Sequence, residues 1–269
     1  MKNFQIELTN HCQLQCEECP NIQMQRKREF MSTAVFDAIL NQYIIPDKPD
    51  TVILHKDGES LLNINIRYFM RAIDYVITTK FDIYTNGLLL TEDFVEFLST
   101  LKNNVRILIS FHFHGAGGKK VDYTNVSHVI ERCMAKQYKN VEFVLVTHKI
   151  DSISMEELTV WEDKWKPALA QYDKFTGLHV NPHINPWAER IKQSNIVSFN
   201  GSCPYADFGH LFFGVTGNII PCCMDLEEEI VFGNVLTDNK ETMMDKVHHF
   251  YKQLENKKVE DKLCQKCLK

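Results

Sequence analysis

Three closely spaced cysteines near the N-terminus constrain this chain more than any other feature. Cys12, Cys16 and Cys19 follow the spacing C-x3-C-x2-C, directly after an apolar, strand-like run at residues 4–8. A [4Fe–4S] cluster normally takes four cysteine ligands, so three thiolates would leave one iron open to a substrate or cofactor. The triplet therefore predicts an iron–sulfur centre on the loop that follows a first strand.

A zinc site is the alternative interpretation of the same residues. Zinc would take the three thiolates together with His11 or another histidine. Most zinc sites pair their cysteines as two C-x2-C units, and the triplet does not have that spacing. The spacing accordingly favours iron over zinc.

The remaining cysteines also follow a pattern. Six of the nine lie outside the triplet: Cys133 alone, Cys203, the adjacent Cys222 and Cys223, and the C-x2-C of Cys264 and Cys267. The cytosol keeps thiols reduced, so in that compartment such cysteines are interpreted as metal or redox ligands before disulfides. The count divides into three ligands, four ligands and two spare cysteines.

Length and composition set the class of protein. A chain of 269 residues, 44% hydrophobic and 24% charged, can bury a substantial core and is expected to form one main domain with a small appendage. No apolar run is long enough to span a membrane, and Glu7 stands where a signal peptide would be apolar. We therefore expect a cytoplasmic protein with no membrane partner.

The charge pattern gives no reason to expect a nucleic-acid partner. The formal net charge is −5, and the densest basic run, residues 24–29, holds three positive charges. A phosphate-tracking groove would need a larger basic cluster. We interpret residues 24–29 as a solvated loop.

Strand-like and helix-like segments alternate through the first two thirds of the chain, which predicts successive βα units and a parallel sheet. The predicted strands are residues 4–8, 51–55, 81–85, 106–112, 141–147 and 178–183. The predicted helices are residues 33–43, 64–76, 91–98, 125–136 and 155–169, the first of them capped by Ser32 or Thr33. The fold class is therefore predicted to be α/β.

The triplet, in its place after a first strand, resembles the signature of the radical S-adenosylmethionine (SAM) enzymes. In that family the open iron is chelated by the amino and carboxylate groups of SAM. Six strands with intervening helices match the family's partial (β/α)6, TIM-like barrel, whose chemistry lies at the carboxyl ends of the strands. The resemblance implies such a barrel over residues 1–190.

Two further motifs support this resemblance. The segment from Lys56 to Leu61 resembles the family's Gly-Gly-Glu-Pro motif, with Asp57 and Ser60 in place of the first glycine and the proline, so Gly58 and Glu59 would contact the SAM amino group. The predicted third strand ends in Thr85 and Asn86, followed by a glycine, which resembles the family's T-N-G turn near the SAM ribose. An acidic loop cap and an ordinary tight turn are the alternative interpretations.

Two single positions bear on how SAM would bind. Ser110, on the predicted fourth strand, matches a position where many family members place a hydroxyl near SAM. The residue before the third cysteine, usually aromatic and beside the adenine, is here Glu18. The adenine contact would then depend on backbone groups or on another side chain.

The C-terminal quarter resembles the twitch domain, a shortened SPASM domain. Two β-rich runs flank Gly217 in a hairpin pattern, and a helical segment over residues 240–254 precedes the final C-x2-C. The resemblance implies a small α+β domain, a β-hairpin plus a helix, over residues 191–269. It also implies one auxiliary [4Fe–4S] cluster, which would be held by Cys203, Cys222, Cys264 and Cys267.

The four C-terminal thiolates would also suit structural zinc. Cys223 has three interpretations: a ligand in place of Cys222, an inert buried thiol, or a hydrogen-atom donor near the substrate. Cys133, on a helical segment remote from both groups, is predicted to lie in the core.

The resemblance implies an oxidoreductase. An electron donor of flavodoxin or ferredoxin type would reduce the first cluster, which cleaves SAM to a 5′-deoxyadenosyl radical. That radical would take hydrogen from a small polar substrate such as a sugar, cyclitol or nucleoside, and the auxiliary cluster would accept an electron. In architecture the chain is similar to the radical SAM dehydrogenases that oxidise 2-deoxy-scyllo-inosamine.

Two other functions remain open. A peptide-modifying radical SAM enzyme, an epimerase or a cross-linking enzyme, would use a peptide substrate, and Cys223 would serve an epimerase as hydrogen donor. A non-catalytic iron–sulfur or zinc protein would cleave no SAM.

Candidate catalytic residues follow the predicted strands. His112 and His114 share one face of the predicted fourth strand, and either could accept a substrate proton because histidine titrates near neutral pH. Arg190 ends a polar, proline-stiffened segment from residue 179 that would line the substrate pocket or link the two domains. Further candidates after apolar runs are Lys56, His148, His183 and Trp187.

Overall fold

The structure is a computed structural model. It describes residues 2–115, 118–183, 185, 187–191, 194, 196, 199, 203–205, 209–256 and 260–268, and of Trp187 it describes the backbone.

Six parallel strands form the body of one sheet. They are β1 (Asn3–Ile6), β2 (Thr51–Ile53), β3 (Lys80–Thr85), β4 (Asn104–Phe111), β7 (Val141–His148) and β8 (Phe175–Asn181). Each strand pairs in parallel with the next in this order. The six predicted strands and the α/β class are confirmed.

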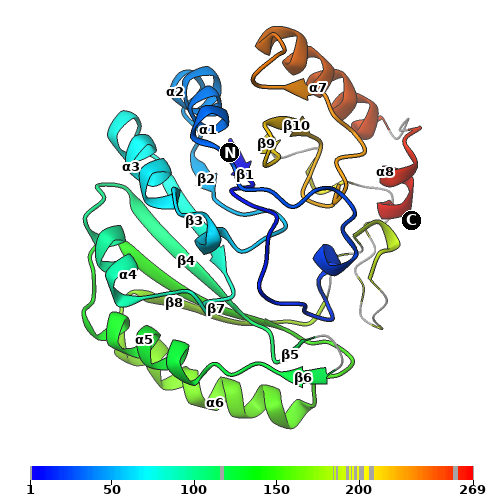
Figure 1. Cartoon of the computed structure of the whole chain (residues 1–269). Coiled ribbons are helices and arrows are strands. Elements are labelled where there is room, and N and C mark those ends of the chain that lie inside the picture. Colours follow the sequence, from blue (N-terminus) through cyan, green and yellow to red (C-terminus); the bar gives the residue numbers. More distant parts are fainter. Residues whose placement is uncertain are drawn as a thin grey trace.

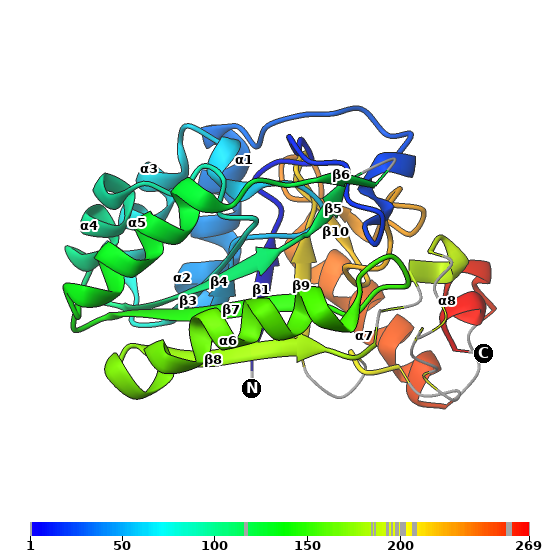
Figure 2. The ribbon, with the colours of Figure 1, turned by 90° about the horizontal axis from the view of Figure 1, so that it is seen from below.

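Helices follow the strands and cover the outer side of the curved sheet (Figure 1, Figure 2). They are α1 (Thr33–Ile39), which continues through the π-helix η2 (Leu40–Ile44) into α2 (Ile45–Asp47), then α3 (Ile66–Val76), α4 (Glu92–Ser99), α5 (Thr124–Ala135) and α6 (Met155–Gln171). Ser32 caps α1 by accepting a hydrogen bond from the Val35 N–H, so the cap is Ser32 and not Thr33. All five predicted helices are confirmed.

Short elements lie in the connections. They are η1 (Pro20–Gln23), η3 (Ser60–Leu62), η5 (Trp187–Glu189) and a small hairpin of β5 (His114–Gly115) and β6 (Lys119–Lys120). Among the described residues, no helix has both the length and the apolar composition that crossing a membrane requires.

The two faces of the sheet differ in chemistry because side chains alternate along each strand. Ile83 on β3 and Ile107 and Ile109 on β4 have no exposed surface and belong to the main hydrophobic core. The alternate positions, such as Tyr84 and Ser110, face the opposite, concave side of the sheet. That concave face carries the polar side chains of the barrel.

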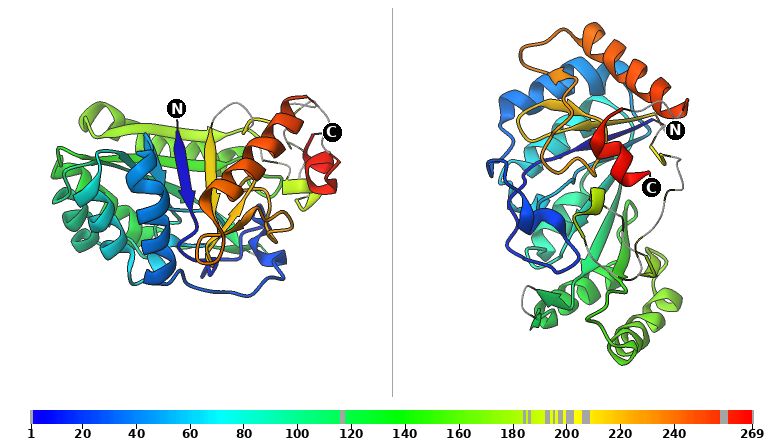
Figure 3. Two further views of the ribbon diagram at one scale, coloured as in Figure 1. Left: turned by 90° about the horizontal axis from the view of Figure 1, so that it is seen from above. Right: turned by 90° about the vertical axis from the view of Figure 1, so that its right-hand side faces the viewer.

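The C-terminal strands join the same sheet (Figure 3). β9 (His210–Phe213) pairs in parallel with β1, and β10 (Asn218–Ile220) and β11 (Gly233–Asn234) extend the sheet in antiparallel fashion. The helices α7 (Lys240–Glu255) and α8 (Lys262–Cys267) follow. The predicted hairpin around Gly217 and the helix near residues 240–254 are confirmed, and the division of the chain at residue 190 stays a prediction.

Several strands end one or two residues away from the predicted position. β2 ends at Ile53, and the last parallel strand covers 175–181 instead of 178–183. β4 ends at Phe111, so His112 and His114 do not lie on it. The reason for the last difference is that the His112 N–H donates to the Tyr123 hydroxyl at 3.0 Å, which takes this N–H out of the sheet ladder.

Gly217 is essential to the hairpin turn. Its φ of 91° lies in the left-handed region, and a Cβ there would come within 2.8 Å of Val235 Cγ2. We expect Gly217→Ala to lower the free energy of unfolding by about 2 kcal/mol or more, from backbone strain and overpacking together. Urea denaturation measures this loss. Gly118→Ala is the control: its φ is 72° and no atom lies within 4 Å of the added Cβ, so only about 1 kcal/mol should be lost. Equal losses would show that the Val235 contact contributes nothing.

Candidate functional site

The three N-terminal cysteines lie on the loop between β1 and η1, at the carboxyl end of the parallel strands. Cys16 is buried and forms an isolated β-bridge with Gly115 of β5. The Cys19 N–H donates to the Cys16 carbonyl at 3.2 Å, which curls the loop so that its thiols approach one another. The structure therefore brings the predicted triplet together.

These thiols suit a bound metal centre. Burial raises the pKa of Cys12, Cys16 and Cys19, that of Cys19 to about 12, and the mutual repulsion of their thiolates adds to the rise in Cys16 and Cys19. Without a cation the three would remain protonated at neutral pH. A metal centre supplies the missing positive charge, so the donor set fits a cluster that needs three thiolates.

Gly58 packs directly against this cysteine loop. A Cβ on Gly58 would lie 2.3 Å from the Thr9 carbonyl oxygen and 2.5 Å from that of His11, and only glycine fits. The next residue, Glu59, donates its N–H to the same His11 oxygen at 2.8 Å. The predicted SAM-binding motif after β2 therefore lies against the cysteine triplet.

The Glu59 carboxylate also holds the turn at the end of β3. It accepts hydrogen bonds from the Leu61 N–H at 3.0 Å, the Thr85 hydroxyl at 2.8 Å and the Asn86 N–H at 2.8 Å. Glu59 is buried, which raises its pKa. Gly58, Glu59, Thr85 and Asn86, all predicted to bind SAM, are thus one connected unit. In this unit Glu59 orients the turn, and its contact with SAM stays a prediction.

Asn86 links this turn to the cysteines. Its side-chain amide donates to Cys12 Sγ at 3.9 Å, and its oxygen accepts a hydrogen bond from Gln13 Nε2 at 3.0 Å. The turn therefore lies beside Cys12 of the triplet. Ser110, the fifth predicted SAM contact, follows on the neighbouring strand β4, and its carbonyl accepts a hydrogen bond from the Tyr123 hydroxyl at 3.4 Å.

Glu18 and His112 form a close pair beside Cys16. Glu18 Oε1 lies 2.5 Å from His112 Nδ1, and one ligating atom from each of Cys16, Glu18 and His112 lies within 4.8 Å of the others. Burial raises the pKa of Glu18, but the hydrogen bond and charge of His112 outweigh it and lower the pKa overall. Glu18, which stands where the family usually has an aromatic residue, therefore contacts the candidate catalytic residue His112.

Two further histidines lie near this pair. Burial lowers the pKa of His55 to about 4 and also lowers that of His148, and repulsion from His112 contributes to both shifts. Three buried atoms of the group, Glu18 Oε2, His55 Nδ1 and His148 Nδ1, have no hydrogen-bond partner among the described residues. Unsatisfied buried polar atoms are rare in proteins, so their convergence on the concave face indicates a polar ligand site.

His55 was not among the predicted site residues. Its ring stacks on Tyr84, with ring centroids 5.5 Å apart, and both follow the inward alternation of β2 and β3. The signal in the sequence was its position: His55 directly follows an apolar run, at the carboxyl end of a strand.

His114 belongs to a different environment. Its Nε2 lies 3.3 Å from Glu157 Oε1, in the first turn of α6, whereas His112 contacts Glu18. The prediction that His112 and His114 share one face is therefore wrong. The backbone leaves β4 after Phe111, so the two-residue strand period no longer applies to them.

The four C-terminal cysteines also converge. α8 carries Cys264 and Cys267 three residues apart, on one face of the helix. Burial, the carboxylate of Asp261 and the nearby thiolates of Cys203 and Cys267 raise the pKa of Cys264 to about 12. Desolvation, Cys223 and Cys264 raise the pKa of the half-buried Cys222. The donor set of four thiols, like the triplet, fits a metal centre.

Cys222 and Cys223 have different neighbours. Cys222 interacts with Cys264, while Cys223 Sγ lies 2.9 Å from the Tyr205 hydroxyl and interacts with Lys56. Burial raises the pKa of Cys223 to about 11. This geometry favours Cys222 as the ligand and places Cys223 toward the barrel.

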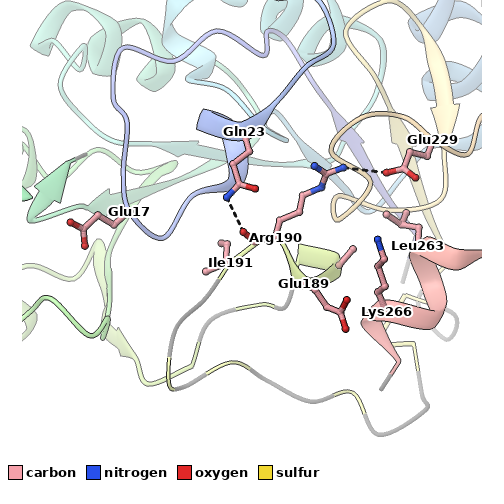
Figure 4. Close-up of a pocket in the computed structure, with 9 residues that line it drawn as sticks. Glu17, Gln23, Glu189, Arg190, Ile191, Glu229, Leu263 and Lys266 are labelled. Atoms are coloured by element: carbon pink, nitrogen blue, oxygen red, sulfur yellow. Dashed lines mark hydrogen bonds and ion pairs between the residues drawn. The ribbon is translucent and has the colours of Figure 1, made fainter. Parts of the chain in front are cut away.

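Arg190 lines a separate cavity of about 740 Å³ between the cysteine loop, η5 and α8 (Figure 4). Its guanidinium lies 3.2 Å from Glu229 Oε1 and 3.6 Å from Glu227 Oε1, and its carbonyl accepts a hydrogen bond from Gln23 at 2.8 Å. The lining residues are Glu17, Gln23, Ala188, Glu189, Arg190, Ile191, Glu229, Leu263 and Lys266. Arg190 therefore links the segments of Gln23 and of Glu227 and Glu229 at this cavity, and it does not lie with His112 at the barrel mouth.

Comparisons with known proteins agree with this architecture. Residues 203–268 match the SPASM family, described as an iron–sulfur cluster-binding domain. No curated protein sequence matches the chain.

Several solved structures share the fold. BtrN in complex with AdoMet and 2-DOIA is similar at a TM-score of 0.70 and 20% identity, over 100% of this chain and 93% of that one. anSMEcpe with bound AdoMet is similar at a TM-score of 0.62 and 16% identity, over 100% of this chain and 85% of that one. SuiB of Streptococcus suis bound to the precursor peptide SuiA is similar at a TM-score of 0.54 and 15% identity, over 99% of this chain and 69% of that one. The chain has the radical SAM fold with a SPASM-type domain at its C-terminal end.

Burial of His55 predicts an acid-sensitive contribution to stability. Its pKa of about 4 in the folded chain lies below the ordinary 6.5, so between these values the unfolded chain binds the proton and the folded chain does not. The free energy of unfolding therefore falls as the pH drops through this range, by up to about 1 kcal/mol per pH unit. We expect His55→Gln to reduce this slope in urea denaturation across the range. His128→Gln, which removes an exposed imidazole, is the control. An unchanged slope in His55→Gln would contradict the prediction.

Proposed function

We propose that this protein is a radical SAM dehydrogenase that oxidises a small polar substrate. One observation carries the proposal: two separate cysteine groups, three after β1 and four around α8, each come together on one radical SAM fold. In this proposal residues 1–190 hold the SAM site and residues 191–269 hold the auxiliary site. An external flavodoxin- or ferredoxin-type protein supplies the electron that starts each turnover.

The bound groups supply the chemistry that side chains lack. When bound, a [4Fe–4S] cluster on Cys12, Cys16 and Cys19 with SAM supplies a carbon radical that removes a hydrogen atom, and a [4Fe–4S] cluster on Cys203, Cys222, Cys264 and Cys267 supplies an electron acceptor. Gly58 gives the close backbone approach, and Glu59 fixes the turn of Thr85 and Asn86 beside the triplet.

The polar concave face supports a small hydroxylated substrate. Glu18, His55 and His148 each present a buried polar atom that a ligand hydroxyl or amine could satisfy. The apolar outer face of the sheet is sealed by helices, so water does not reach the site from that side. BtrN, similar in fold, was solved with 2-DOIA, whereas SuiB was solved with a peptide.

Oxidation of a hydroxyl-bearing carbon also requires loss of the hydroxyl proton. His112 is placed to accept it, because Glu18 holds Nδ1 and leaves Nε2 available. The carbon-bound hydrogen leaves as an atom, the proton goes to the imidazole, and one electron goes to the auxiliary site. The two-electron oxidation is then complete.

The iron content tests the proposal most directly. We expect anaerobically reconstituted protein to hold about eight irons, and the variant Cys12→Ala/Cys16→Ala/Cys19→Ala to hold about four. After dithionite reduction, only the wild type should cleave SAM. Zinc in the C-terminal group would remove the electron acceptor and overturn the dehydrogenase. A fully loaded wild type that cleaves no SAM would leave a non-catalytic iron–sulfur protein.

One observation favours a second candidate, a peptide epimerase. Cys223 is hydrogen-bonded to Tyr205 and lies toward the barrel, where an epimerase would need a hydrogen-atom donor. We expect Cys223→Ala to leave turnover within about twofold of wild type, because the dehydrogenase needs no hydrogen donor other than its substrate. Product analysis beside SAM cleavage measures this. Loss of product with SAM cleavage preserved would instead support the epimerase.

A further inference from the structure

The segment 24–29 connects the two cysteine regions, although its sequence predicts a solvated loop. We call it the arginine strap. Arg26 and Arg28 turn inward, while Lys27 between them stays exposed: the Arg26 side chain is 13% exposed and that of Lys27 is 80%. Alternate residues of an extended chain face opposite sides, so one arginine follows the other inward. The prediction of a solvated loop is wrong for both arginines.

Arg28 holds the N-terminal cysteine loop. Its guanidinium donates to the Asn10 carbonyl at 2.6 Å and to the side chain and backbone of Asn21 at 2.9 and 2.5 Å. Asn10 in turn donates to the Lys27 carbonyl at 2.8 Å and accepts from the Glu29 N–H at 2.7 Å. Asn10 and Asn21 flank the cysteine triplet, so the strap fixes both ends of the loop that carries it.

Arg26 holds the loop that follows Cys222. Its Nε donates to the Leu226 carbonyl at 2.7 Å, and Nη1 lies 3.0 Å from Glu228 Oε1. The backbone N–H groups of Gln25 and Arg26 both donate to the Glu227 carboxylate, at 2.9–3.1 Å. One face of the strap therefore binds residues 226–228 of the SPASM-type region.

The same guanidinium reaches two carboxylates of the barrel. Arg26 pairs with Glu7 through both terminal nitrogens, at 2.5 and 2.9 Å, and with Asp57 at 2.9 Å. Glu7 has no exposed surface, and its Oε2 also accepts the Val215 N–H at 3.0 Å. A planar guanidinium can serve three carboxylates and a carbonyl at once because its five N–H donors form a rigid fork, and an ammonium cannot reproduce this pattern.

The loop that Arg26 holds is itself well ordered by hydrogen bonds. The Asp225 carboxylate accepts the N–H groups of Glu229 and Ile230 at 2.8 and 3.0 Å, and the Asp225 carbonyl accepts Lys56 Nζ at 2.9 Å. Glu228 also accepts Asn218 Nδ2 at 2.7 Å. A movement of Arg26 would consequently move the loop as a unit, together with the adjacent Cys222.

We propose that Arg26 is a positioning residue that fixes the C-terminal cysteine site relative to the N-terminal one. The inference rests on the proposed function, in which an electron passes to the C-terminal site. Transfer of that electron requires a fixed separation between the substrate and the acceptor. The strap supplies it: Arg28 holds one cysteine loop and Arg26, two residues away, holds the other.

The test uses the full chain, reconstituted anaerobically with iron and sulfide. Arg26→Lys keeps the charge and loses the fork, Arg28→Lys makes the same change on the other cysteine loop, and Lys27→Gln is the exposed control on the strap. Hydrogen exchange followed by mass spectrometry reports opening of residues 222–230. EPR of the dithionite-reduced protein reports the magnetic interaction between the two clusters.

We expect Arg26→Lys to retain both clusters and SAM cleavage, with amide exchange in residues 222–230 faster by about tenfold and a weakened cluster–cluster interaction. Arg28→Lys should instead raise exchange around residues 10–21, and Lys27→Gln should change neither region. Wild-type exchange and an unchanged magnetic interaction in Arg26→Lys would overturn the inference. So would a uniform rise over the whole chain, which is the mark of a merely structural role.

If Arg26→Lys does not fold, Glu228→Gln tests the same contact with the barrel pairs left intact. It should show the same local rise in exchange, and wild-type exchange in residues 222–230 would overturn the inference. The proposed function fails by a separate outcome, a wild-type protein that lacks one cluster or cleaves no SAM. The comparison of amide exchange between the wild type and the variant that folds decides the positioning role whether or not the proposed function holds.

Discussion

The buried pair of Glu7 and Arg26 is the interaction on which the arrangement of this protein depends. β1 lies between β2 and β9 and pairs in parallel with both, so the barrel and the C-terminal hairpin meet along one strand. At the end of that strand the Glu7 N–H donates to the Phe213 carbonyl at 2.9 Å and its carboxylate accepts the Val215 N–H. A carboxylate with no exposed surface is costly unless it is paired. Arg26 provides the pairing and thereby brings the segment after the cysteine triplet to the same point.

The polar concave face results from the alternation of side chains along each strand. Alternation sends Ile83, Ile107 and Ile109 to the helices, where close packing of apolar side chains stabilises the fold, and leaves the other face free for polar groups. On that face the fold loses some stability, because Glu18, His55 and His148 each have a buried polar atom without a hydrogen-bond partner among the described residues. Such a loss persists where a ligand compensates for it, which is why we propose this face, and not the cavity at Arg190, as the substrate site.

The sequence predicted those features whose signals are local. Periodicity located the strands and helices, spacing located both cysteine groups, and the burial of Cys133 in the core is confirmed. It could not predict the role of Arg26, because Glu228 lies 202 residues away and three adjacent cations have no local pattern that distinguishes an inward side chain. His114 was misplaced for a related reason: the end of β4 is set by the hydroxyl of Tyr123, a residue on a different segment.

The adjacent cysteines Cys222 and Cys223 show how closely the two halves are joined. One interacts with Cys264 of the C-terminal group, and the next residue contacts Tyr205 and lies near Lys56 of the barrel. Lys56 also donates to the Asp225 carbonyl and pairs with Asp57, which Arg26 binds. A single peptide unit thus separates the proposed auxiliary ligand from the polar interior. An electron acceptor held by Cys222, as proposed, would therefore be anchored by Arg26 and Lys56, while Arg28, two residues from Arg26, holds the cysteine triplet.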